Sequence, residues 1–253
     1  MPSTENQHTP SRARGEQARQ QLLAAAIEVF GEYGLQGATT REIAQRAGQN
    51  IAAITYYFNS KEGLYLAVAQ WIADFIQQTF RTQSQEVEDF WLLPAPQRPP
   101  ERYLYHLKRG LLDFSELMTQ PQTLNLSKIM SREQLSPTDA YPLIHQQVIA
   151  PLHQMLCRLL AGYTGLDAQS TKIVLHTHAL IGEVLSFRVG RETVRRQAGW
   201  QQIGSEEAAQ ISAVLAEHIE ILVCGLRQRY GAYPRHTSSC MCVGFPRSPQ
   251  SLT

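Results

Sequence analysis

Histidines in the second half of the chain have the side chains best suited to metal-dependent chemistry. His176 and His178 are two positions apart, so a helix would point their rings about 200° apart. A zinc-binding pair uses residues three or four positions apart on one helical face. His145 and His153 are eight positions apart, with Pro151 between them. The sequence also has no nucleophile elbow, phosphate loop or dinucleotide-binding glycine pattern. We therefore expect no catalytic residues, no metal, no cofactor and no enzyme activity.

Polar residues within the apolar C-terminal helices are better candidates for a small-molecule pocket, because such pockets are mostly apolar with a few convergent polar groups. The candidates are Arg132, Glu133, His145, His178, Glu183 and Arg188. Each has a simpler alternative. Arg132 and Glu133 could form an exposed pair, His178 could be a core histidine, and Glu183 and Arg188 could pair at a subunit interface.

The residues from Thr39 to Lys61 form another kind of pattern, with two short helices joined by a tight turn. Thr39 and Glu42 have the spacing of a capping box at the start of the first helix. Gly48 can take the left-handed conformation that often ends a helix, and Asn50 can cap the second helix. A short turn that contains glycine and joins two helices is typical of the helix-turn-helix motif.

The second helix of this motif has a polar outer side. Ile54 and Phe58 are four positions apart and are expected to pack inward. The residues left for the outside include Asn50, Ala53, Thr55, Tyr56, Tyr57 and Lys61. Small side chains allow close approach to a DNA groove, and hydroxyl and ammonium groups suit phosphate oxygens. Ordinary helical hairpins have the same spacing, so spacing alone leaves DNA binding and simple packing equally open.

The motif resembles the DNA-binding domain of TetR-family transcriptional regulators over residues 17–66. The residues at the positions of that family's pattern are Thr40, Ile43, Ala44, Ala47, Gly48, Ile54, Phe58, Ser60, Lys61 and Leu64. The sequence departs from the pattern at Gln49-Asn50 and at Thr55, which affects the expected base preference more than the fold. The segments LSKIMSREQLSPTDAY and LHTHALIGEVLSFRVG resemble the CecR-like branch and extend the resemblance to about residue 230.

The resemblance implies a homodimer that binds a palindromic double-stranded DNA operator and responds to a small-molecule effector. It places Thr40, Tyr57 and Lys61 on phosphates. It places base reading on Arg41 and on the start of the second helix, namely Asn50, Ile51, Ala52, Ala53 and Thr55, with Tyr56 beside them. The last two long helices would pair with their mates as a four-helix bundle. There are two alternatives. One is a ligand-binding helical protein or enzyme with a vestigial helix-turn-helix, and the other is a protein–protein adaptor.

Composition agrees with an all-α protein of two parts. Across 253 residues the net charge is only +1 and the hydrophobic content is 43%, so DNA binding would depend on a local patch. The expected units are a disordered arm at 1–15, a three-helix DNA-binding domain at 16–62, a helical ligand-binding and dimerisation domain at 63–230, and a disordered tail at 231–253. No signal peptide or apolar run of about 20 residues is expected. We therefore predict a cytoplasmic protein, and the resemblance implies a bacterial one that is nucleoid-associated when bound to DNA.

Capping residues and prolines predict where several helices begin and end. Asn59 and Glu62 have capping-box spacing before a long amphipathic helix that reaches residue 80. Residues 92–100 form a proline-rich loop. Pro137 is expected at the first turn of a helix that reaches about residue 163 and is kinked by Pro151. Ser205 is expected to cap the last helix. Cys240 and Cys242 fall in the tail and are interpreted as chance cysteines.

Overall fold

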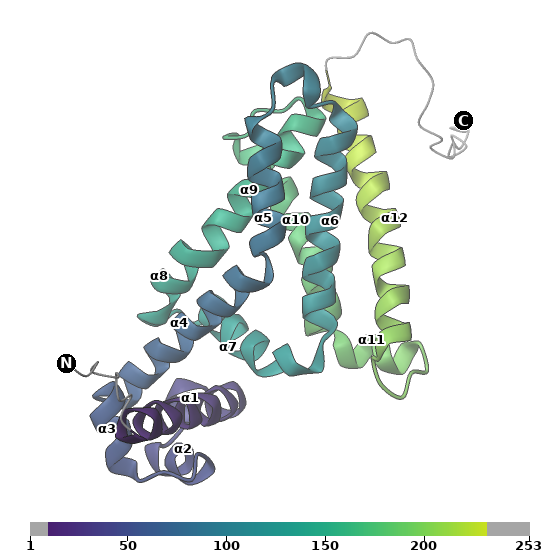
Figure 1. The fold of residues 1–253 in the computed structure, drawn as a ribbon. Coiled ribbons are helices and arrows are strands. Elements are labelled where there is room, and N and C mark those ends of the chain that lie inside the picture. The colour runs from purple at the N-terminus through teal and green to yellow at the C-terminus, as the bar shows by residue number, and fades with distance from the viewer. Residues whose placement is uncertain (1–9, 232–253) are drawn as a thin grey trace, which may run out of the picture.

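The computed structural model describes residues 10–231, and every element in that range is a helix (Figure 1). The expected all-α fold is confirmed for this range. Four helices build the N-terminal part and the start of the connection to the rest: α1 (Pro10–Gly37), α2 (Thr40–Arg46), α3 (Ile51–Phe58) and α4 (Lys61–Thr79). The tail cysteines Cys240 and Cys242 and residues 1–9 lie outside the described residues.

The larger C-terminal part contains the remaining elements. They are α5 (Arg81–Leu92), η1 (Ala95–Gln97), α6 (Pro100–Thr119), η2 (Pro121–Thr123), α7 (Leu124–Leu135), α8 (Ala140–Ile144), the π-helical η3 (His145–Ile149), α9 (Ala150–Thr164), α10 (Thr171–Val189), α11 (Arg191–Gln197) and α12 (Ser205–Tyr230). Figure 1 shows α4 running diagonally from the N-terminal helices towards α5, while α6, α10 and α12 stand beside one another.

Local signals in the helix-turn-helix segment are confirmed in most cases. The Thr39 side chain accepts a hydrogen bond from the Glu42 amide at 3.2 Å, and the Asn50 side chain accepts one from the Ala52 amide at 2.9 Å. Gly48 has a φ of 64°, which only glycine adopts without strain. The expected cap of α4 was wrong by one residue, because Ser60 accepts from an α4 amide.

Three other helix starts differ from the predictions. Helix α1 begins at Pro10, so residues 10–15, which were expected in a disordered arm, are helical. Proline has a preset φ and lacks the N–H that a first turn leaves unpaired, so it suits this position. The helix expected from Pro137 begins instead at Ala140. Ser205 is the first helical residue of α12, and the preceding Gly204 is its cap.

The proline inside the α8–α9 segment is accommodated by a π-helical turn instead of a simple kink. Pro151 has no N–H, so the Gln147 carbonyl loses its usual helical donor. The Gln77 side chain of α4 donates to that carbonyl at 2.9 Å. The amide groups of Gln70 and Gln147 also bond to each other at 2.9 and 3.0 Å. The irregular segment η3 is therefore fastened to α4.

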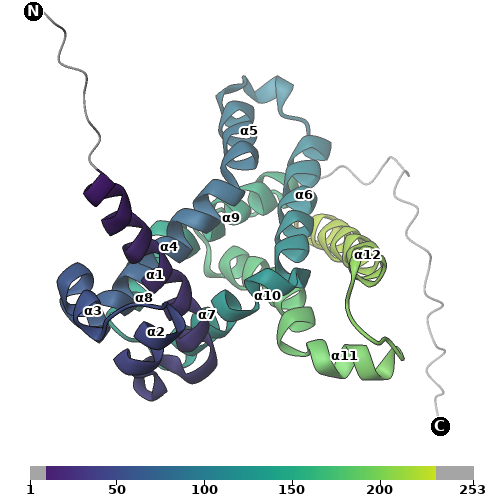
Figure 2. The same cartoon turned by 60° about the horizontal axis from the view of Figure 1, so that its bottom comes forward.

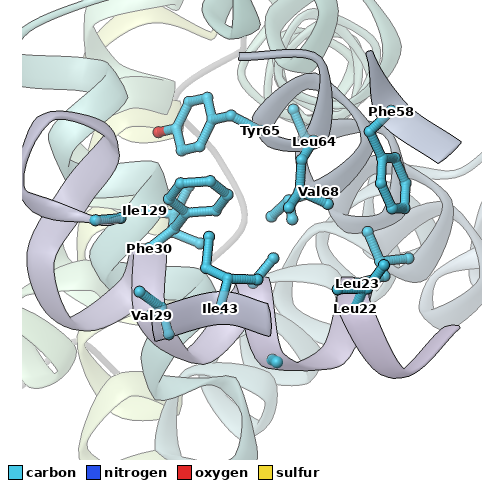
Figure 3. Packing of buried hydrophobic residues seen from close by; sticks show 14 of the residues in the cluster. Leu22, Leu23, Val29, Phe30, Ile43, Phe58, Leu64, Tyr65, Val68 and Ile129 are labelled. Carbon is cyan, nitrogen blue, oxygen red and sulfur yellow. The ribbon is translucent and has the colours of Figure 1, made fainter. Parts of the chain in front are cut away.

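The first hydrophobic core unites the N-terminal helices with part of the C-terminal region. In Figure 3 the rings of Phe30 and Tyr65 lie side by side near Ile129, with ring centroids of the two aromatic residues 4.9 Å apart. Leu126 and Ile129 of α7, and Ala140 and Ile144 of α8, belong to this same core. The expected boundary between residues 62 and 63 therefore does not separate two cores, because α7 packs on α1 and α8 packs on α4.

The second core lies between α5, α6, α9, α10 and α12. Leu107 and Leu111 of α6, Leu159 of α9, Ile173 of α10 and Leu215 of α12 are all at most 1% exposed. Cys157 and Cys224 are both buried in this core. Helix α10 is largely apolar, yet it exposes Leu175 and Val189 in the single chain.

Helix α12 is the one element among the described residues that is long and apolar enough to cross a membrane by length and composition. This corrects the expectation that no segment approaches that length. The helix carries Glu217, His218 and Glu220 near its middle and packs on α6 and α9. Both features are typical of a packing helix in a globular domain.

Candidate nucleic-acid interface and ligand domain

The outer side of α3 presents most of the residues predicted to contact DNA. Tyr56 is 80% exposed and Ile51 is 48% exposed. Ala52 and Thr55 are exposed as well, and Ala53 is half-buried. The inward packing of Ile54 and Phe58 is confirmed, since they are 1% and 5% exposed. The helix therefore presents small and aromatic groups outward while its apolar side fixes it to α1 and α4.

Three of the predicted contact residues are already engaged within the chain. The Asn50 side-chain oxygen caps α3. The Lys61 ammonium donates to the Ala38 carbonyl at 3.1 Å, just before α2 begins. Tyr57 is half-buried, and its ring meets that of Tyr56 edge to face at 4.8 Å. A Cβ added at Gly15 would lie 3.3 Å from the Tyr57 hydroxyl, so this hydroxyl lies against α1.

The two arginines of α2 have different environments. Arg46 is in ion-pair distance of Glu28, Glu32 and Glu42, at 3.7, 3.2 and 3.1 Å. These bonds join α2 to α1 and raise the pKa of Arg46, chiefly through the hydrogen bond to Glu32. Arg41 is exposed at the start of α2, beside the half-buried Thr40. Arg41 is therefore the α2 guanidinium best placed to reach a bound DNA, and Arg46 positions the helix.

The predicted ligand residue Arg132 contacts the C-terminal part of α1. Its guanidinium donates to the carbonyls of Phe30 and Gly31 at 2.9 Å and of Glu32 at 3.0 Å. The helical φ/ψ of α1 is interrupted at Gly34, where φ is 71°, and a Cβ there would meet the Arg132 side chain at 3.3 Å. A cation at a helix C-terminus is favourable because the unpaired carbonyls carry partial negative charge.

Glu133 makes a second connection between the same two regions. It is 2% exposed and accepts a hydrogen bond from the Tyr65 hydroxyl of α4 at 2.8 Å. The Thr138 amide donates to the other carboxylate oxygen at 3.0 Å. Burial, followed by the hydrogen bond to Glu133, raises the pKa of Tyr65 far above its ordinary value. The buried carboxylate therefore ties α4 to α7 and to the loop after α7.

Arg188 is buried at the other end of the C-terminal domain, where α6 ends. Its Nη2 group donates to the Gln120 carbonyl at 3.1 Å and contacts the Thr123 hydroxyl. The neighbouring Arg191 donates to the Thr119 carbonyl at 3.3 Å. Burial, with a smaller contribution from Arg191, lowers the pKa of Arg188 to about 10. These two arginines therefore bind the C-terminal end of α6.

The six predicted ligand residues do not converge on one site in the single chain. His145 is exposed on η3 beside Tyr141, whereas the His178 ring lies 6.1 Å from that of His153. Glu183 of α10 pairs with His218 of α12. Arg132 and Glu133 border one cavity between α1, α4 and α7, while the other four residues lie elsewhere. Most of the six also hold helices to one another, and their role in ligand binding stays a prediction.

Sequence reasoning missed the buried polar groups that have no partner among the described residues. Gln83 lacks partners for both amide atoms, and His106 lacks one for Nε2. Burial lowers the pKa of His106 and keeps its ring neutral near pH 7. Gln83 also lines a cavity between the α4–α5 junction and α6. No local pattern marks these residues, because the helices that surround them are distant in sequence.

The comparisons with known proteins match both parts of this architecture. Residues 22–68 match the family described as "Bacterial regulatory proteins, tetR family". Residues 100–226 match the family described as "HTH-type transcriptional dual regulator CecR, C-terminal domain". The chain belongs to the TetR family of transcriptional regulators. CecR of Shigella flexneri, an HTH-type transcriptional dual regulator, is 55% identical to this TetR-family chain over 216 residues, which cover 85% of the chain and 96% of that relative. The match therefore places the chain in the CecR-like branch.

Solved structures of TetR-like proteins share the fold of this TetR-family chain. A TetR-like transcriptional regulator from Rhodococcus sp. RHA1 has a TM-score of 0.58 at 16% identity and covers 82% of this chain and 96% of its own. AibR, in complex with isovaleryl coenzyme A and operator DNA, has a TM-score of 0.57 at 16% identity, with 80% and 97% covered. The family and the CecR relative are DNA-binding regulators of transcription, not enzymes.

Proposed function

We propose that this regulator binds a palindromic operator as a homodimer in the bacterial cytoplasm, and that a small molecule in the C-terminal domain changes that binding. The two α3 helices would enter successive major grooves about 34–36 Å apart. Association with the nucleoid follows from DNA binding. The observation that carries the proposal is the outward group on α2 and α3, above all Arg41, Thr55 and Tyr56.

The contacts of this group divide by chemistry. Arg41 is assigned to base reading, since a guanidinium can donate two hydrogen bonds to guanine O6 and N7. Ala52, Ala53 and Thr55 permit close approach to the groove floor. Thr40, Tyr57 and Lys61 supply hydroxyl and ammonium donors for phosphates. Lys61 would exchange its bond to the Ala38 carbonyl for a phosphate, so its contribution is partly offset by the bond it gives up.

Exposed apolar side chains on the last two long helices support a homodimer. Leu175 and Val189 on α10 are 63% and 78% exposed, and Ile221 and Leu222 on α12 are 57% and 50% exposed. Figures 1 and 2 place α12 at the edge of the C-terminal domain. Apolar groups gathered on two neighbouring helices are typical of an interface, and pairing with a second copy would bury them in a four-helix bundle.

Control by an effector needs a physical connection between the C-terminal domain and the DNA-binding helices. The α1 carbonyls held by Arg132 and the bond between Tyr65 and Glu133 supply two such connections. A movement of α7 would be transmitted to α1 and α4, and so to the distance between the two α3 helices of a dimer. An effector can shift this distance only by its different affinities for the two arrangements.

Fluorescence anisotropy would test the proposal, with DNA from upstream of the regulator's own gene, a scrambled duplex and several salt concentrations. We expect selective binding whose affinity falls linearly in log salt. Arg41→Ala should cost about 1–3 kcal/mol and relax sequence preference, whereas Lys61→Ala should weaken all sequences alike and flatten the salt slope. Arg81→Ala, an exposed arginine on α5, is the control and should change neither. Failure to bind any duplex at low salt would refute DNA recognition.

A further inference from the structure

A cavity of about 390 Å³ lies where the end of α4 and the start of α5 face α6. Its volume falls in the range of small-molecule sites. Two phenylalanine rings, Phe75 and Phe80, form an apolar side. Gln83, Asp113 and Glu116 are among the polar residues that line the cavity. The cavity therefore combines an apolar wall with a small number of polar groups.

Gln83 indicates that the cavity is shaped to hold a polar ligand. The residue is 6% exposed, and neither its amide nitrogen nor its oxygen has a partner among the described residues. A buried amide without partners is costly, so such groups usually bind something. A Cβ at Gly110 would lie 3.1 Å from the Gln83 nitrogen, so glycine in the middle of α6 leaves room for this amide.

The charged groups that line the cavity are negative. Asp113 and Glu116 are three positions apart on α6 and both border the cavity. Arg109 is the nearby cation, but it lies 2.7 Å from Glu86 and 3.7 Å from Asp113, so it mainly neutralises Glu86. Burial raises the pKa of Asp113, Arg109 opposes this shift, and the neighbouring carboxylates Glu116 and Glu86 add to it. Arg188 is not a lining residue and directs its Nη2 group to the carbonyls that end α6.

A further aromatic ring stands behind the apolar side of the cavity. Trp71 stacks on Phe75, with ring centroids 5.4 Å apart and planes 8° from parallel. Aromatic faces attract organic cations, and carboxylates beside them strengthen the attraction. We propose that this cavity binds a lipophilic organic cation, with its charge at Asp113 and Glu116, its apolar groups on Phe75 and Phe80, and a polar contact to Gln83.

The cation would act as the effector, and this part of the inference rests on the proposed function. Phe75 and Thr79 of the cavity wall belong to α4, the helix whose other end begins directly after α3. A ligand between α4 and α6 would change their separation and thereby the position of the DNA-binding helices.

The test uses isothermal titration calorimetry of the full chain with tetraphenylphosphonium and tetraphenylborate, two ions of matched size and opposite charge. We expect the phosphonium ion to bind and the borate to bind much more weakly. The variant Asp113→Asn with Glu116→Gln should weaken phosphonium binding about threefold to tenfold, the loss expected when one partly buried and one exposed charge contact disappear. Glu88→Gln with Glu101→Gln removes the same charge from exposed positions on α5 and α6 and is the control.

Three results would overturn the assignment: no phosphonium binding, equal binding of the two ions, or unchanged affinity in the Asp113 and Glu116 variant. Thermal midpoints of all variants, measured alongside, show that they are folded. Operator anisotropy with saturating phosphonium then separates the two hypotheses. Binding of the cation without any change in operator affinity would uphold the cavity and refute control of DNA binding through it.

Discussion

The bond between Tyr65 and Glu133 gives the sharpest prediction about how the two regions are joined. Tyr65→Phe removes one hydroxyl and leaves the ring packed against Phe30. The hydroxyl donates at 2.8 Å to a carboxylate that is 2% exposed, and a hydrogen bond to a charged group contributes about 1.5–3 kcal/mol. Thr138 still donates to Glu133 in the variant. The decrease in the free energy of unfolding should therefore stay below the roughly 3–5 kcal/mol expected when a buried charge is left unpaired.

Differential scanning calorimetry at pH 7.5 would measure the effect. For a chain of this size, 1 kcal/mol corresponds to about 2–4 °C in Tm, so Tyr65→Phe should lower the Tm by roughly 3–12 °C. Tyr56→Phe makes the same chemical change at a side chain that is 80% exposed and should leave the Tm unchanged. A double-mutant cycle with Glu133→Gln should show a coupling of about 1–2 kcal/mol. Two results would refute the assigned bond. One is additive free-energy changes for Tyr65→Phe and Glu133→Gln, and the other is a decrease in Tm for Tyr65→Phe that equals the decrease for Tyr56→Phe.

The pH dependence of the same variant follows from the raised pKa of Tyr65. The folded chain holds the phenolic proton more tightly than the unfolded chain, in which tyrosine titrates near pH 10. The stability from this proton is therefore complete below about pH 10 and is lost as the pH rises further. The difference in unfolding free energy between the wild type and Tyr65→Phe should stay constant up to pH 9 and narrow above pH 10. Narrowing below pH 9 would contradict the raised pKa.

Three further substitutions test other contacts. Gly31→Ala would place a Cβ 2.6 Å from that of Asn125, so it should destabilise the α1–α7 contact by about 1–3 kcal/mol, and Asn125→Gly should restore most of the Tm. Leu175→Glu with Leu222→Glu should convert a dimer to monomers in analytical ultracentrifugation and weaken operator binding; an unchanged sedimentation coefficient would move the interface elsewhere. Arg132→Met should lower stability by about 1–2 kcal/mol through loss of three carbonyl bonds, and an unchanged Tm would contradict its role at the end of α1.

The parts of the fold that depend on neighbouring residues could be predicted from the sequence. Thr39 and Asn50 each bond to an amide two or three positions away, and the turn at Gly48 requires only its own backbone freedom. The inward pair Ile54 and Phe58 follows from helical periodicity. Such signals are local because the atoms that satisfy them lie within one turn of helix.

The roles of Arg132 and Glu133 could not be predicted in the same way. A polar pair in an apolar helix indicates that partners exist, and a small-molecule pocket was a reasonable hypothesis. The carbonyls that bind Arg132 lie about a hundred positions earlier in the chain, and Tyr65 lies 68 positions before Glu133. Only the packing of α7 on α1 and α4 brings these groups together. The hydrophobic periodicity of the sequence does not predict which helices pack against each other.

The proline at 151 shows how a local signal can have a nonlocal outcome. Its missing N–H predicts a disturbance in the helix. The structure has a π-helical turn there, and Gln77 of another helix donates to the Gln147 carbonyl that lost its usual donor. The same limit applies to the cavity. Gln83 and Asp113 are polar residues of unremarkable spacing until α5 and α6 face each other.

Helix α4 connects all of these features. Along its length it carries Tyr65 at the Glu133 bond, Gln70 and Gln77 at η3, and Phe75 and Thr79 at the cavity. A rigid helix fixed at three places along its length cannot respond to a ligand at one end without straining contacts at the other. Weakening the Tyr65 bond should therefore reduce the change in operator affinity that a cavity ligand produces, even where the ligand still binds. Equal responses in the wild type and Tyr65→Phe would show that the signal reaches α3 by another route, through α1 and Arg132.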